Sequence, residues 1–174
     1  MEIEGSSLFK SSAFEKEKNM DVVLSVKDHI LNLEMNRKNM HSIRVRNDMF
    51  HHSLVSKSVE MGIKYENFPS VFQLNFDYED GFNKTISEFK VMEVDTHEVE
   101  NEAYKKYHIN LLKIVDKYYN EEELSEVEKY CLVLALHDRK DLNTICNGDD
   151  KMEEAEKKLD NLSTKKMGTR VIIR

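Results

Sequence analysis

Proline, cysteine and long apolar runs are all scarce in this chain of 174 residues. No apolar run approaches the roughly 20 residues that a membrane-spanning helix needs, and the N-terminus lacks the apolar core of a signal peptide. The sequence therefore predicts a soluble cytoplasmic protein that does not bind membranes. The only proline, Pro69, stands just before an apolar run and so marks the start of a strand.

The chain has only two cysteines, and its charge is unevenly spread along the sequence. Cys131 and Cys146 lack the spacing of metal ligands, which favours reduced, structural thiols. The formal net charge of -7 argues against nucleic-acid binding by the protein surface as a whole. Between residues 36 and 64, however, basic residues outnumber acidic ones, and this stretch is either a phosphate-binding surface or a solvated helix face. The basic residues are Arg37, Lys38, Arg44, Arg46, Lys57 and Lys64.

Two runs rich in valine, isoleucine and leucine, residues 20–26 and 29–35, flank the polar pair Lys27-Asp28. This pattern predicts a β-hairpin. A turn centred on the pair puts Asp21 directly opposite Glu34, where the two Cβ atoms lie roughly 5 Å apart. Two opposed carboxylates destabilise a sheet unless a metal ion or a shared proton relieves their repulsion.

The alternation of side chains along the hairpin sorts them onto two faces. We expect the apolar face to be the buried one, and it comprises Val22, Leu24, Val26, Leu31 and Leu33. The polar face comprises Asp21, Ser25, Asn32, Glu34 and Asn36. Hard cations such as Mg²⁺ bind carboxylate and carbonyl oxygens, and the carbonyl of Met35 is adjacent to Glu34. In the alternative interpretation, Asp21 is a turn residue and Glu34 a solvated charge.

The remaining pattern predicts an α/β fold with a mixed central β-sheet flanked by helices. We expect a single domain over residues 1–174, with a sheet core and one helix at 19–114 and a helical part at 116–162. His51-His52 has no third ligand at metal spacing, so we expect it at the surface or facing phosphate. The expected strands are 71–76, 86–94 and 108–114, and residues 171–173 are either a short strand or a frayed end. The expected helices are 40–61 (ended by Gly62), 121–136, 140–146 and 150–162.

Asp21, followed by a strand, a turn and the strand end Leu33-Glu34-Met35-Asn36, resembles the Asp…Glu-x-Lys core of the PD-(D/E)XK nuclease superfamily. More narrowly, it resembles the PD-(D/E)XK nuclease family transposases, the recombination-promoting nuclease group. Arg46-Asn47, Phe50, Gly62 and Tyr65 follow in the order of that family's next helix. The likeness covers most of residues 19–163, in a copy that we interpret as shortened at both ends.

This resemblance implies a restriction-endonuclease-like core and a metal-dependent DNA endonuclease of mobile-element type. Asp21, Glu34 and the Met35 carbonyl would hold Mg²⁺, or Mn²⁺ in its place. Asn36 would orient the attacking water and complete the catalytic set. The phosphate-binding residues would be Arg46 and Arg44. The partner would be nucleic acid, specifically DNA, and a homodimer is open.

A second hypothesis is a catalytically inactive nuclease-like domain that acts only by binding. Asn36 is one methylene shorter than the glutamine typical of this family position, so its amide would reach less far toward a water. Such a domain would grip nucleic acid or inhibit another protein, such as a foreign nuclease. The acidic stretch 121–160 would then be a contact surface that mimics nucleic-acid charge.

Overall fold

The computed structural model of the chain describes residues 2–4, 7–8, 18–19, 21–37, 41–58, 64–78, 82–136, 138–155 and 157. The chain separates into two compact units, residues 1–112 and residues 113–174. The single-domain interpretation stays a prediction. Within the ranges given above, no helix combines the length and the apolar character that crossing a bilayer requires.

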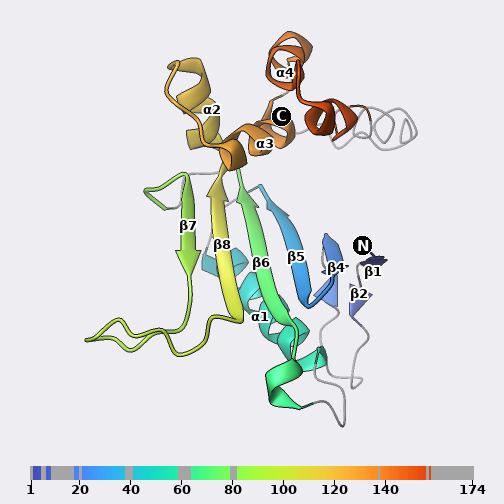
Figure 1. Ribbon diagram of the computed structural model, residues 1–174. Helices are drawn as coiled ribbons and strands as arrows, with labels where there is room; N and C mark the ends of the chain where they lie inside the picture. Colours follow the sequence, from blue (N-terminus) through green and yellow to red (C-terminus); the bar gives the residue numbers. More distant parts are fainter. Residues whose placement is uncertain are drawn as a thin grey trace. The chain divides into compact units, whose positions relative to one another are not determined.

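The first unit is built on a mixed β-sheet whose strands lie in the order β1-β4-β5-β6-β8-β7 (Figure 1). β5, β6 and β8 are parallel neighbours, whereas β1, β4 and β7 each pair antiparallel. The strands are β1 (Glu2–Glu4), β4 (Val22–Val26), β5 (His29–Asn36), β6 (Ser70–Asp77), β7 (Ile86–Phe89) and β8 (Tyr104–Asn110). β2 (Ser7–Leu8) and β3 (Lys18–Asn19) form a separate two-stranded sheet. The predicted mixed sheet is confirmed.

The hairpin has the register that its sequence predicts. Val22 pairs with Leu33 and Val26 with His29, so the two-residue turn lies at Lys27 and Asp28. Lys27 adopts a φ of 52°, the left-handed conformation that tight hairpin turns require. One further step along the same register brings the residue before β4, Asp21, opposite Glu34.

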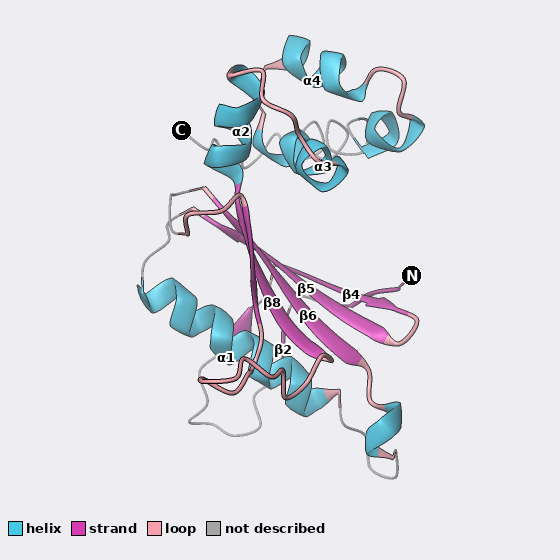
Figure 2. Cartoon of the chain, turned by 60° about the vertical axis from the view of Figure 1, so that its left-hand side comes forward, coloured by secondary structure: helices cyan, strands magenta, loops and turns pink. Residues whose placement is uncertain are grey.

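The choice of the buried face was wrong. Glu34 is 1% exposed and Asn32 is fully buried, whereas Val22 on the opposite face is 38% exposed. The reason is helix α1 (His41–Lys57), which runs along the polar face of the sheet (Figure 2). Phe50 and Leu54 of this helix pack with Val23 and Val71 in an apolar cluster on that face.

The later strands begin and end at other residues than expected. β7 ends at Phe89, before the expected end at residue 94, and Met92 instead forms an isolated antiparallel bridge with Val99 in the stretch between β7 and β8. β8 begins at Tyr104, before the expected strand start at residue 108, because Lys105 and Lys106 are neutralised there by ion pairs. β8 also ends earlier than predicted. The expected helix end at Gly62 and residues 171–173 lie outside the described residues.

The second unit is helical. It begins within α2 (Leu111–Tyr119). Apolar residues at 111, 114, 115 and 118 recur there at helical spacing, so residues 111–114, which were expected to be strand, are helical. α3 (Glu126–Ala135) starts with a capping box between Ser125 and Glu128, and α4 (Arg139–Cys146) is capped by Asp138. Helical structure resumes at residues 150–155. Both cysteines are buried, and burial raises the pKa of the Cys131 thiol to about 11.

The packing of α1 on the sheet predicts unequal costs for truncations along this helix. Leu54→Ala removes a buried side chain from the apolar cluster and should lower the free energy of unfolding by about 2–4 kcal/mol. Val45→Ala is the matched control, because Val45 is exposed on the same helix and its loss should cost less than about 0.5 kcal/mol. Urea denaturation of both variants measures the difference. Equal costs would contradict the described packing.

Candidate active site

Asp21 and Glu34 are locked together by two hydrogen bonds between adjacent strands. The backbone N–H of Asp21 donates to Oε1 of Glu34 at 3.3 Å. The backbone N–H of Met35 donates to Oδ2 of Asp21 at 2.7 Å. Asp21 is exposed while Glu34 is buried, so the pair forms an acidic site with one open side.

The pair lies in an environment that opposes negative charge. Burial of Glu34 and the neighbouring charge of Asp21 raise the pKa of the Glu34 carboxyl to about 7, and the nearby Arg46 offsets only part of this. A bound cation would relieve both the repulsion and the lost hydration.

The Met35 carbonyl faces the same edge as the carboxylates. In a strand, the N–H and C=O of one residue point to the same side, and the N–H of Met35 points to Asp21. The next carbonyl, that of Asn36, accepts from the N–H of Tyr78 on the opposite side. Two carboxylates and a carbonyl are oxygen donors of the kind that Mg²⁺ and Mn²⁺ prefer, so these residues fit a hard divalent ion.

The donor set is a sparse one. Among the residues that the structure describes, no group of three or more His, Cys, Asp or Glu side chains could hold a metal ion. A cation at Asp21 and Glu34 would therefore complete its coordination with water and substrate oxygens. This is the usual state of Mg²⁺ in phosphate-processing sites.

The guanidinium of Arg46, on α1, lies beside the buried carboxylate of Glu34. Its Nη2 lies 3.5 Å from Oε2 of Glu34 and donates to Oδ1 of Asn36 at 3.0 Å. Nη2 and Nε also donate to Oδ1 of Asn47, at 3.2 and 3.3 Å. The side chain remains 44% exposed, so its guanidinium borders both the carboxylate and the solvent.

Asn36 is buried with both ends of its amide engaged. Its Oδ1 accepts from Arg46, and its Nδ2 donates to Oδ1 of Asp77 at 3.0 Å. Arg44, the other predicted phosphate-binding residue, has its guanidinium 4.3 Å from the ring centroid of Phe82. Thus Asp21, Glu34, Met35, Asn36 and Arg46 lie together, and Arg44 contacts a different group.

A comparison with protein families matches residues 1–171 to the model described as PD-(D/E)XK nuclease family transposase. The chain belongs to this family. Curated proteins and solved structures gave no significant match. The family and the mixed sheet together confirm the expected restriction-endonuclease-like α/β core.

The polar side chains of this PD-(D/E)XK core extend well beyond those expected. Along β5, β6 and β8, every second residue toward the carboxyl end is polar, and register brings them into rows beneath α1. The alternation of polar residues in each strand was a signal for them. The buried members of these rows that the site prediction missed are Asn32, Gln73, Asn75, Asp77, His108 and Asn110.

His51 is also buried, so the expectation that it lies at the surface was wrong, and the alternative, that it faces phosphate, stays a prediction. His51 is 5% exposed, because it lies on the same stripe of α1 as Asn47, Phe50 and Leu54. His52 is exposed, as expected. Burial, together with the positive charge of Lys106, lowers the pKa of His51 to about 4.

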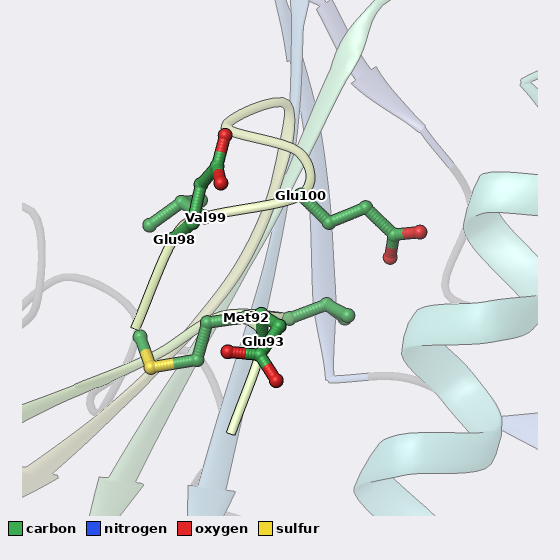
Figure 3. A pocket seen from close by; sticks show the side chains of 6 residues that line it. Met92, Glu93, Glu98, Val99 and Glu100 are labelled. Atoms are coloured by element: carbon green, nitrogen blue, oxygen red, sulfur yellow. The ribbon is translucent and has the colours of Figure 1, made fainter. Parts of the chain in front are cut away.

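A cavity of about 450 Å³ on the loop that follows β7 is a poor candidate for nucleic acid. Figure 3 shows its lining, which includes the carboxylates of Glu93, Glu98 and Glu100 beside Met92 and Val99. Three carboxylates with no basic residue in the lining would repel phosphate.

The lowered pKa of His51 predicts a stability loss in acid. The unfolded chain takes up this proton near pH 6.5 and the folded chain near pH 4, so the contribution of His51 to the free energy of unfolding falls as the pH drops through this window. Between pH 7 and pH 5 this contribution should fall by roughly 2 kcal/mol, while the raised pKa of Glu34 acts in the opposite direction in every variant that keeps Glu34. His51→Leu should therefore shift the difference in unfolding free energy between the two pH values by that amount relative to the unmodified chain, as measured by urea denaturation.

His52→Leu is the matched control, because His52 is the exposed neighbour on the same helix. This variant should keep the pH dependence of the unmodified chain. If the two variants showed the same pH dependence, the burial of His51 would not be its source.

Proposed function

We propose that this chain is a metal-dependent DNA endonuclease of mobile-element type that hydrolyses phosphodiester bonds. The family assignment supports a nuclease-like domain of a transposase, and transposases act on DNA. The observation that carries the proposal is the buried carboxylate of Glu34, hydrogen-bonded to the backbone of Asp21 on the adjacent strand, with a pKa raised to about 7.

Asp21, Glu34 and the carbonyl of Met35 would hold Mg²⁺, or Mn²⁺ in its place. When bound, such an ion lowers the pKa of a water molecule and offsets negative charge on the phosphate. The sheet fixes both carboxylates through backbone hydrogen bonds, so binding an ion costs little side-chain entropy. The contribution of the chain is a pre-organised acidic edge.

Arg46 would bind a phosphate oxygen of the DNA backbone. Its guanidinium carries five N–H donors in a planar fork, and it is part-exposed beside Glu34. A positive charge at this point attracts the polyanionic substrate to an otherwise acidic edge. Arg44, two residues earlier on α1 and stacked against Phe82, would contact a separate part of the DNA backbone.

A second function has one specific observation in its favour. Asn36 was expected to orient water, but both ends of its amide are engaged by Arg46 and Asp77. Without a free amide, the site loses that water-orienting group. A domain of this kind would act by binding nucleic acid or by inhibiting another protein such as a foreign nuclease.

Cleavage of supercoiled plasmid DNA in the presence of Mg²⁺ or Mn²⁺ tests the proposed activity. Glu34→Gln and Asp21→Asn should each lower the rate at least about a hundredfold, because each neutralises a carboxylate of the metal site. Asp28→Asn is the matched control: it neutralises a carboxylate in the turn of the same hairpin and should leave the rate unchanged. Cleavage that survives Glu34→Gln would rule out this site.

Isothermal calorimetry with Mn²⁺ separates the two functions. The endonuclease requires one ion to bind at millimolar concentration or tighter, and Glu34→Gln should abolish the heat of binding. A chain that binds DNA without cutting it and takes up no Mn²⁺ would support the binding domain and contradict the nuclease.

A further inference from the structure

Four polar side chains form a continuous chain from β8 to α1. His108 meets Asp77 at 2.7 Å, Asp77 accepts from Asn36 at 3.0 Å, and Asn36 accepts from Arg46 at 3.0 Å. The first three are buried, and only Arg46 is part-exposed. These hydrogen bonds thus lead from the interior of the sheet to the guanidinium of Arg46.

We propose that Asp77 and His108 are positioning residues of the nuclease site, which hold the Arg46 guanidinium beside Glu34 by fixing the orientation of the Asn36 amide. This inference rests on the proposed function, in which Arg46 binds phosphate. Register places Asn75 between Glu34 and His108, so His108 stands two strands from Glu34, roughly 10 Å away. It acts through its neighbours and does not touch substrate.

The amide of Asn36 has two possible orientations, and Asp77 selects one of them. A carboxylate accepts hydrogen bonds and donates none, so the amide must turn its NH₂ group toward Asp77. Its oxygen then faces Arg46, which can only donate. With the amide reversed, NH₂ would confront the guanidinium, and Arg46 would lose an acceptor.

His108 holds the second oxygen of Asp77. The Nδ2 group of Asn75 donates to the carbonyl of Tyr107 and lies 3.5 Å from Nε2 of His108. A donor on that side leaves Nε2 as the acceptor, so Nδ1 carries the hydrogen that points to Asp77. The rings of Phe82 and Phe89 pack around the imidazole, with centroids 4.9 and 5.5 Å away, and fix its plane.

A parallel set of contacts explains why the site should survive the loss of Asp77. Arg46 also donates to Asn47, and Asn47 donates to Oδ1 of Asn75 at 2.8 Å. This second route keeps Arg46 attached to the sheet. Losing the Asn36 route should therefore misalign the guanidinium without detaching it.

Asp77→Asn tests the proposal, because asparagine keeps the volume but can present either an oxygen or an NH₂ group to Asn36. The rate of plasmid cleavage at saturating Mg²⁺ should fall roughly ten- to a hundredfold. In an Arg46→Ala background the same substitution should have no further effect, since the group being positioned is gone. Equal losses in both backgrounds would show a merely structural role and overturn the proposal.

Two further variants sharpen the test. His108→Phe keeps an aromatic ring between Phe82 and Phe89 but removes the donor to Asp77, so it should lower the rate in the same direction and by less. Asp48→Asn is the matched control: Asp48 lies on the same helix as Arg46, and its ion pair is with Lys106. The control should cleave like the unmodified chain, and a loss equal to that of Asp77→Asn would overturn the proposal.

A measurement independent of catalysis separates this proposal from the proposed function. The ¹⁵Nε order parameter of Arg46, measured by NMR relaxation without DNA or metal, should fall in Asp77→Asn and stay unchanged in Asp48→Asn. An unchanged order parameter in Asp77→Asn would overturn the positioning role. If the unmodified chain failed to cleave DNA, the endonuclease would be refuted, and the NMR result alone would decide the positioning.

Discussion

The pairing of β4 with β5 brings two carboxylates against each other, and the first unit is arranged around this contact. Asp21 and Glu34 are joined through backbone N–H groups, so neither side chain can turn away without breaking a hydrogen bond. Placing a carboxylate in the interior is unfavourable unless it is paired and hydrogen-bonded. The nearby guanidinium of Arg46 supplies part of that pairing.

The helix that covers the sheet makes this arrangement tolerable. α1 contributes Phe50 and Leu54 to an apolar cluster at one end, and Asn47 and Arg46 to a polar network at the other. Buried polar networks specify one packing when most of their members find partners. The same helix therefore supplies the apolar packing of the unit and the only cation recorded within 4 Å of Glu34 among the described residues.

The sequence was sufficient for the register of the hairpin, because a two-residue turn at Lys27 and Asp28 leaves one alignment of the two arms. It was misleading about which face is buried. Polar residues such as Asn32, Glu34 and Asn36 ordinarily face water, and only a helix that itself carries polar groups can cover them. The stripe of α1 that faces the sheet contains Asn47 and His51, so the apolar spacing of the helix alone did not reveal it.

Asp77 and His108 could not be assigned to the site from the sequence, since they meet Asn36 only across strands that are far apart in the chain. The end of β8 was missed for a related reason. Apolar residues after Asn110 suit a strand and a helix equally over such a short run, and tertiary packing decides between them.

Anomalous X-ray diffraction from crystals soaked in Mn²⁺ tests the central claim most directly. The account predicts one anomalous peak within about 2.5 Å of carboxylate oxygens from both Asp21 and Glu34. Crystals that show no peak there, or a peak that contacts only one of the two carboxylates, would contradict it.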